Sequence, residues 1–246
     1  MNIKHIIEND TLNEHTYLIY IPNFLDKNTL DLLNRWLIIK NKLFSGGDIT
    51  EKNKVYRKQI WFQKDGEYFC KSWKNKYKRW EAKKYEKELI YIQTKVKDKL
   101  NYLLLNKINN DFIKKNINFN LDFNSCLLNL YENGQEFISP HRDCIESFGL
   151  YPTIIGLSIG ETRTLRFKKI KFNKNNLKSL KKDMNNTFDF TLQNNSIFIM
   201  AGCSQKYYTH EIIKDNSKNK RYSFTFRKWQ TADNLINFLS YINHKT

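Results

Sequence analysis

The chain has 246 residues and a formal net charge of +17, from 42 Lys and Arg against 25 Asp and Glu. Its 40% hydrophobic content is enough for a buried core, and no apolar run approaches the ~18 residues of a membrane-spanning helix. The opening residues lack the apolar stretch of a signal peptide. We therefore expect a soluble, intracellular monomer, in the nucleus or cytoplasm, with no membrane partner.

Charge and cysteine content narrow the partners further. The excess of seventeen positive charges favours a polyanionic partner such as nucleic acid. The four cysteines lie far apart and form no CxxC pair, which disfavours a zinc knot or a disulfide framework. We expect them to be reduced and mostly buried thiols: Cys70, Cys126, Cys144 and Cys203.

The first half of the chain combines strand and helix patterns. Residues 17–25 read as a short strand that runs into a turn, and residues 26–39 repeat apolar positions at helical spacing. Residues 55–69 mix aromatic and basic side chains and look like strand and loop. The spacing in 73–103 predicts an amphipathic helix, or two in series, with a lysine-rich outer face.

After residue 110 the pattern changes to short alternating runs separated by glycines, which indicates a barrel or sandwich. The lysine- and asparagine-rich piece 169–187 is expected to be an exposed excursion between strands. We expect one structural domain, with an N-terminal helical region (1–110), a core (111–230) and a tail (231–246). The expected strands are 125–131, 153–159, 163–168, 196–200, 207–213 and 221–227.

A candidate metal site comes from two histidines and an aspartate. On a strand, positions i and i+2 face the same side, so His141 and Asp143 would project together. His210 lies in another alternating run. Two His and one carboxylate on one face of a ferrous ion leave adjacent positions open for reactants. Alone, the pair more often makes a surface ion pair or a hydrogen-bonded buried histidine.

The run from Arg221 to Arg227 alternates with period two. Arg221, Ser223, Thr225 and Arg227 share one face, and the aromatic residues between them share the other. A barrel interior would not bury two guanidinium groups without anionic partners, and a dicarboxylate matches their geometry. The alternative is a surface strand with solvated arginines.

Taken in order, these motifs resemble the AlkB-like dioxygenases that use Fe(II) and 2-oxoglutarate. The resemblance implies an α+β fold: a double-stranded β-helix (jelly roll) core with N-terminal helices and a nucleotide-recognition lid. The elements that carry it are Tyr20–Leu25, Asn129–Tyr131, Gly134, His141–Asp143, Ser158–Gly160, Arg166–Phe167, Ser196–Met200, Gly202, Gln205, His210 and Arg221–Arg227.

The resemblance also implies roles for individual residues. The metal ligands and catalytic residues would be His141, Asp143 and His210, with Fe(II), 2-oxoglutarate and O₂ as cofactors. The cosubstrate would be bound by Arg221, helped by Asn129, Tyr131, Ser223 and Arg227. Two departures stand out: Ser223 replaces the usual Asn, and Asn195 takes a turn position usually given to Gly. The reaction would oxidise an N-methyl group on a base and release formaldehyde and succinate.

The implied substrate is alkylated DNA, with N1-methyladenine or N3-methylcytosine extruded from the duplex onto an aromatic side chain. The residues expected to contact it, within and after the lid segment Val55–Gln59, are Arg57, Trp61, Phe62, Tyr68 and Glu146. Ile145 stands where many DNA-repairing relatives carry an acidic residue. RNA therefore stays open as a substrate, as do hydroxylation of a protein or small molecule and a catalytically silent nucleic-acid-binding role.

Overall fold

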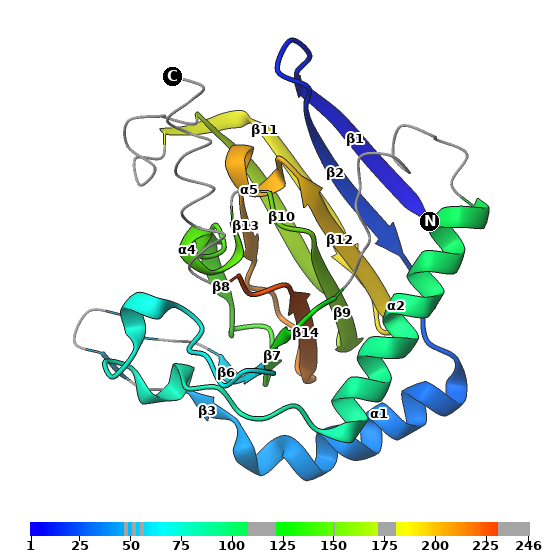
Figure 1. The fold of residues 1–246 in the computed structure, drawn as a ribbon, viewed down its shortest axis with the longest axis vertical. Coiled ribbons are helices and arrows are strands. Elements are labelled where there is room, and N and C mark those ends of the chain that lie inside the picture. Colours follow the sequence, from blue (N-terminus) through cyan, green and yellow to red (C-terminus); the bar gives the residue numbers. More distant parts are fainter. Residues whose placement is uncertain are drawn as a thin grey trace.

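Two antiparallel sheets make the framework of the molecule and enclose a common pocket (Figure 1). The computed structural model describes residues 1–46, 49–50, 53–54, 57–107, 122–149, 151–171 and 181–230. The predicted positions Val55 and Tyr56 and the tail 231–246 lie outside them. Among the described residues, no helix combines the length and apolarity needed to cross a bilayer.

The large sheet has the strand order β1-β2-β12-β9-β14-β7-β6-β3. Strands from the N-terminal region and from the second half of the chain therefore share one sheet, with β2 hydrogen-bonded to β12 and β6 to β7. Its strands are β1 (Asn2–Asn9), β2 (Glu14–Ile21), β3 (Ser45–Gly46), β6 (Lys58–Gln63), β7 (Ser125–Tyr131), β9 (Ile154–Gly160), β12 (Ser196–Gly202) and β14 (Arg221–Arg227).

The small sheet has the order β11-β10-β13-β8. A separate pair, β4 (Ile49–Thr50) and β5 (Asn53–Lys54), stands apart from both sheets. The strands of the small sheet are β8 (Ile138–His141), β10 (Arg163–Lys171), β11 (Lys181–Leu192) and β13 (Tyr208–Ile212); the short helical elements are α4 (Ile145–Phe148), α5 (Ser204–Tyr207) and the 3-10 turns Asn41–Leu43, Lys71–Trp73 and Lys78–Trp80.

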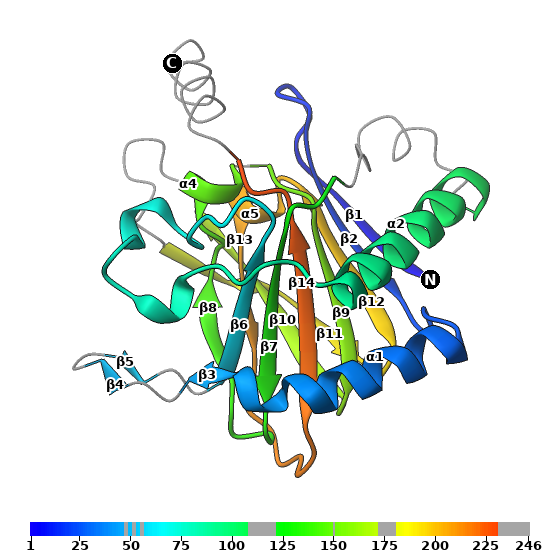
Figure 2. The same cartoon turned by 60° about the horizontal axis from the view of Figure 1, so that its bottom comes forward.

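Two long helices, α1 (Lys27–Lys40) and α2 (Lys87–Lys107), lie across the outer face of the large sheet (Figure 2). Helix α1 begins where predicted because the Asp26 carboxylate accepts a hydrogen bond from the Thr29 amide at 2.9 Å, which caps the first turn. Its buried stripe, which includes Trp36, packs with α2 on the sheet's aromatic residues.

Strand β14 shows how one alternating sequence serves two layers. Phe224 and Phe226 point to the helix side and belong to the main hydrophobic core. The arginines, Ser223 and Thr225 point to the other face and line the pocket. The predicted two-faced strand is therefore confirmed, and so is the α+β jelly-roll fold.

Two predicted elements were partly wrong. In 73–86 the chain forms short 3-10 turns and irregular structure instead of a helix, and Asn75 takes a left-handed φ of 65° that an α-helix does not accommodate. In 169–187 the described ends are not an excursion: they continue β10 and begin β11, which pair with each other. Strands β1, β3, β4, β5, β8 and β11 were not predicted.

Asn195 holds the turn before β12 in the left-handed region, at φ 55°, and its side chain makes two hydrogen bonds to the backbone of Leu25, at 2.8 and 2.9 Å. We expect Asn195→Gly to lower the free energy of unfolding by about 2 kcal/mol, from two lost hydrogen bonds. Asn195→Ala should lower the free energy of unfolding by about 1 kcal/mol more than Asn195→Gly, because a left-handed φ is unfavourable for alanine. Urea unfolding of both variants measures the difference, and equal costs would contradict the strained turn.

Candidate active site

A cavity of about 670 Å³ opens between the two sheets. Residues of β7, β9, β12 and β14 line it from the large sheet, and residues of β8, β10 and β13 line it from the small sheet. Segment 57–80 adds a further wall. The cavity is therefore built from parts of the chain that are far apart in sequence.

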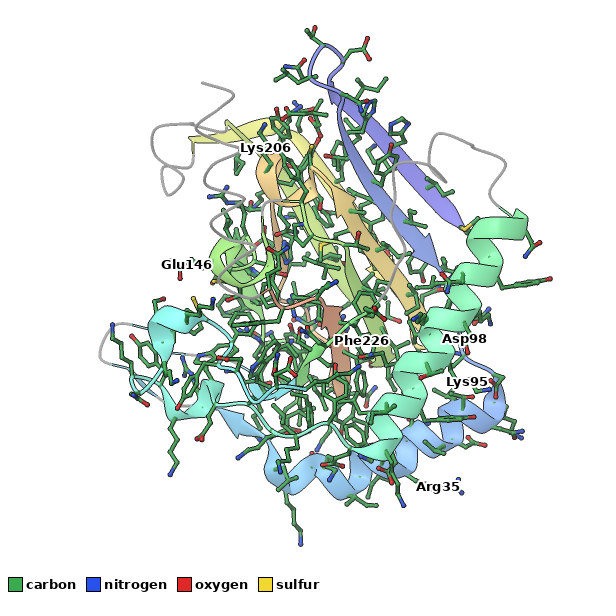
Figure 3. The ribbon with its side chains drawn as sticks, in the orientation of Figure 1. Arg35, Lys95, Asp98, Glu146, Lys206 and Phe226 are labelled. Atoms are coloured by element: carbon green, nitrogen blue, oxygen red, sulfur yellow. The ribbon has the colours of Figure 1, made fainter. Side chains whose placement is uncertain are left out.

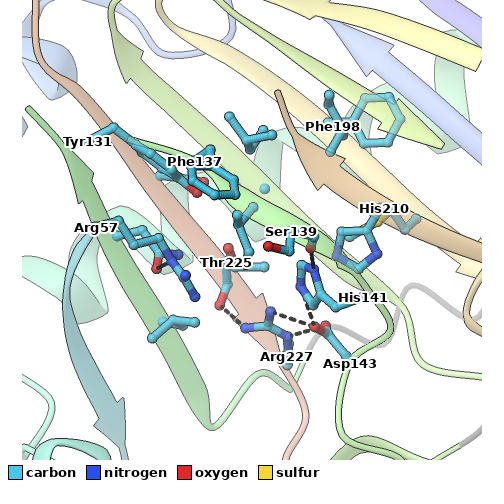
Figure 4. Close-up of a pocket in the computed structure, with 18 of the residues that line it drawn as sticks. Arg57, Tyr131, Phe137, Ser139, His141, Asp143, Phe198, His210, Thr225 and Arg227 are labelled. Atoms are coloured by element: carbon cyan, nitrogen blue, oxygen red, sulfur yellow. Dashed lines mark hydrogen bonds and ion pairs between the residues drawn. The ribbon is translucent and has the colours of Figure 1, made fainter. Parts of the chain in front are cut away.

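His141, Asp143 and His210 converge at this cavity, each offering a ligand atom within 4.8 Å of the others. The register explains the meeting, since β8 and β13 place His141 directly opposite His210, and their ring centroids are 4.3 Å apart. Asp143 follows the end of β8 and turns back toward the two rings (Figure 4). The structure thus brings the predicted triad together.

The electrostatics of the triad suit a cation. His141 Nδ1 donates to the Ser139 carbonyl at 2.8 Å, which leaves the lone pair on Nε2, 3.9 Å from an Asp143 oxygen. Burial lowers the pKa of His141, and burial together with the nearby His141 lowers the pKa of His210 to about 3. Both imidazoles are therefore neutral at neutral pH, the form that binds metal ions.

Asp143 is held by a buried ion pair. Arg227 donates from Nε to one carboxylate oxygen at 2.6 Å and from Nη2 to the other at 3.2 Å, and the Gln205 side chain accepts from the Asp143 amide at 2.9 Å. Burial works against the charged carboxylate, but Arg227 and the histidines outweigh it and lower the pKa of Asp143 to about 2. Asp143 is therefore ionised at neutral pH.

Arg221 is also buried, at 1% exposure, but the described residues offer it no carboxylate. Its Nη2 donates to Ser158 at 2.9 Å, while Nε and Nη1 have no hydrogen-bond partner among them. Burial lowers the pKa of Arg221 to about 10, and Tyr131 partly offsets this. The antiparallel pairing of β14 with β7 determines the neighbours of Arg221, because it places Arg221 beside Tyr131 and Ser223 beside Asn129.

An aromatic wall faces the same cavity and is formed by Phe69, Trp73 and Trp80. Trp73 is half-buried; its ring stacks on Phe69 at 5.7 Å and lies 5.2 Å from Trp80. Arg57 also lines the cavity, where its Nε donates to Asn129 at 2.8 Å. The wall was missed from sequence because the helical spacing of its tryptophans indicated core positions.

Four predicted substrate contacts lie elsewhere. Trp61 and Phe62 are each 1% exposed: Trp61 is covered by Phe69 and Phe148, and Phe62 packs on the helix side of the sheet. The structure therefore does not support a base-stacking role for either ring. The remaining two also do not line the cavity: Tyr68 packs beside Trp61, and Glu146 lies exposed on α4 with its carboxylate near Ser72 (Figure 3).

The residues present fit the expected groups. Two neutral imidazoles and an ionised carboxylate on one side of a cavity are the donor set of a non-haem ferrous site. The buried Nδ1 of His210 has no hydrogen-bond partner among the described residues. At the other end of β14, the unpaired donors of Arg221 suit a carboxylate in bidentate geometry.

Comparison with known proteins identifies the class. Residues 17–227 match the profile of the 2OG-Fe(II) oxygenase superfamily, so the chain belongs to that superfamily, whose members use Fe(II), 2-oxoglutarate and O₂. The chain is 32% identical over 114 residues to the human protein named alpha-ketoglutarate-dependent dioxygenase alkB homolog 3, and 31% identical to its Bos taurus counterpart. The predicted resemblance to AlkB-like dioxygenases is thereby confirmed.

The extent of these matches differs. Each alignment covers 43% of this chain and 36% of the relative, so it spans little more than a third of the relatives' length. The solved structure titled "The structure of OsALKBH1" superimposes with a TM-score of 0.55 over 86% of this chain and 97% of that chain. Its sequence identity is 15%, and the likeness shows the fold alone.

The Asp143–Arg227 pair yields a prediction for stability. In metal-free protein, Asp143→Asn should lower the free energy of unfolding by about 3–5 kcal/mol, because it leaves a buried guanidinium unpaired. The double variant with Arg227→Met should recover most of the loss. Urea unfolding with a chelator present measures both.

The control is the exposed pair of Arg166 and Asp189, with 33% and 43% of the side chains exposed. Asp189→Asn should cost less than ~1 kcal/mol. If Asp143→Asn cost no more than Asp189→Asn, the buried pair would not be a major constraint on the fold.

Proposed function

We propose that this chain is an Fe(II)- and 2-oxoglutarate-dependent demethylase of alkylated nucleobases in DNA. The observation that carries the proposal is that one cavity joins the His141–Asp143–His210 triad to the aromatic wall of Phe69, Trp73 and Trp80. An aromatic wall beside an oxidising centre suits a flat substrate with a methyl group directed at the metal. A methylated, cationic base also gains about 0.5–2 kcal/mol against an aromatic face.

In this proposal the iron is held by His141, Asp143 and His210. Arg221 binds the distal carboxylate of 2-oxoglutarate, with Tyr131, Asn129 and Ser223 beside it, and Arg227 keeps Asp143 ionised and oriented. The metal supplies O₂ activation coupled to decarboxylation of 2-oxoglutarate. The chain's own share is to place the cosubstrate, exclude water and direct the N-methyl group at the metal.

The segment that carries the wall also supplies charge for a nucleic-acid backbone. Five basic residues lie within residues 71–80, the stretch that contains both tryptophans, and a phosphate backbone is attracted to such clusters. The wall would hold the base while these side chains hold the strand, which is the role we propose for this segment as a lid. The five are Lys71, Lys74, Lys76, Lys78 and Arg79.

The test is incubation with Fe(II), 2-oxoglutarate and oligonucleotides that carry N1-methyladenine or N3-methylcytosine, in single- and double-stranded DNA and RNA. Mass spectrometry should show loss of the methyl group from DNA, with formaldehyde and succinate formed in equal amounts. Arg221→Met should lose both products by losing the cosubstrate contact. If the Arg221→Met variant still formed both products, the cosubstrate would have to bind at other residues.

Other outcomes would replace the proposal. Demethylation confined to RNA strands would change the substrate class, an outcome consistent with the position of Glu146, whose carboxylate lies against Ser72 and outside the cavity lining. Succinate formed with a protein extract, without formaldehyde from methylated bases, would indicate a protein hydroxylase. Strand binding with neither product would indicate a catalytically silent protein.

Trp73→Ala should weaken binding of methylated single strands by about 1–3 kcal/mol, because one stacking face is lost. The unmethylated strand should lose less, since it lacks the cationic base. Fluorescence anisotropy measures both affinities. Tyr102→Ala is the control: this ring lies on α2, is 58% exposed and does not line the cavity. Equal effects of the two substitutions would contradict a stacking role for Trp73.

A further inference from the structure

Two cysteines that are 74 residues apart in sequence meet beside the active-site cavity. The Sγ atoms of Cys70 and Cys144 are 2.9 Å apart. Cys70 directly follows Phe69 of the aromatic wall, and Cys144 directly follows Asp143 and itself lines the cavity. The two sulfurs therefore bring the segment that carries the aromatic wall into contact with the segment that carries Asp143.

The surroundings hold these two segments in place. The Ser147 hydroxyl donates to the Phe69 carbonyl at 2.7 Å, which pins the two backbones together next to the thiols. Ser72 Oγ lies 3.3 Å from the Cys70 sulfur, and the contact with Cys144 lowers the pKa of Cys70. More of the nucleophilic thiolate of Cys70 is thus present at neutral pH.

We propose that Cys70 and Cys144 form an oxidisable dithiol that closes to a disulfide in the presence of hydrogen peroxide. An S–S bond of about 2.05 Å requires the sulfurs to approach by only about 0.9 Å. The first thiolate attacks peroxide, which breaks the O–O bond, gives a sulfenic acid and releases hydroxide. The second thiol displaces that oxygen as water, so the two thiols are oxidised, peroxide is reduced to two waters, and one S–S bond forms.

A metal site is the competing use of the same atoms. Cys70, Cys144 and Glu146 offer three donors close enough for one ion. A closed structural zinc site takes four protein donors, and the described residues supply three here. Direct contact between the two sulfurs favours the disulfide, and zinc is therefore an outcome of the test.

Closure would tie the wall to the loop that carries Asp143. The residues after Cys70, through Trp80, make 3-10 turns with exposed lysines, whereas α4 packs into the core through Phe148. A covalent bond between the two would restrict movement of the wall relative to the metal ligands. The consequence for substrate access rests on the proposed function, but the disulfide itself does not.

The experiment treats the full chain with hydrogen peroxide, blocks remaining thiols with iodoacetamide and maps the tryptic peptides. Trypsin places Cys70 in Asp65–Lys71 and Cys144 in Asp143–Arg163. We expect these two peptides to appear joined, two hydrogens lighter than their sum, and to separate on treatment with dithiothreitol. Cys126 and Cys203 are buried like Cys70, and they serve as internal controls that should stay unjoined. Amide exchange between residues 67 and 81 should slow on the order of tenfold in the joined form.

Cys70→Ser and Cys144→Ala should each abolish the joined peptide. The cross-link in the wild-type chain is itself the main result, and detecting it does not require either variant to fold. Two alkylated thiols after peroxide, or oxygen added to one sulfur without cross-linking, would overturn the proposal. One equivalent of zinc that co-purifies and is lost in both variants would also overturn it, by assigning the cluster to a metal. None of these outcomes depends on demethylation, so a failure of the disulfide proposal can be told apart from a failure of the proposed function.

Discussion

The buried ion pair of Arg227 and Asp143 is the constraint on which the site depends. It joins the last residue of β14 in the large sheet to the loop that follows β8 in the small sheet. Phe69 and Phe148 flank the guanidinium at 5.8 and 5.1 Å. One arginine therefore fixes the acidic metal ligand, couples the two sheets and supports the aromatic wall, because its charge cannot be buried without that carboxylate.

The two arginines of β14 have different roles: Arg227 stabilises the fold, and Arg221 has donors that the described residues leave free for a ligand. Arg227 has its anion within the chain, whereas the described residues give Arg221 a hydrogen bond to Ser158 and the face of Tyr131 but no carboxylate. A buried guanidinium with unsatisfied donors lowers the stability of the ligand-free fold, and a bound carboxylate would restore those contacts. At one end of β14, Arg227 is therefore neutralised by Asp143, whereas at the other end the free donors of Arg221 suit a small dianion.

Alternation along the strand predicted both faces of β14, because spacing of two on a strand determines which side chains share a face. The triad was predicted through the family resemblance, and Asp143 lies in the loop after β8, where strand spacing does not place it. The sequence also predicted a helix over residues 26–39, which the structure shows as α1, whereas the cap at Asp26 was found only in the structure. It did not predict which strands pair, and pairing is what places His141 opposite His210. In this respect the resemblance to a known family supplied what local periodicity could not.

The wrong predictions of substrate contacts have a physical origin in what covers each side chain. Trp61 lies on the pocket side of β6, level with Leu127, but Phe69 and Phe148 cover it there. Whether a side chain on the correct face reaches the cavity depends on what a distant segment places over it. The tertiary contacts of residues 64–86 contribute to this, and burial in that segment follows neither a helical nor a strand period. The aromatic wall is therefore the part of the site least visible in sequence, whereas the cavity-facing residues of β14, placed by strand geometry, are the most visible.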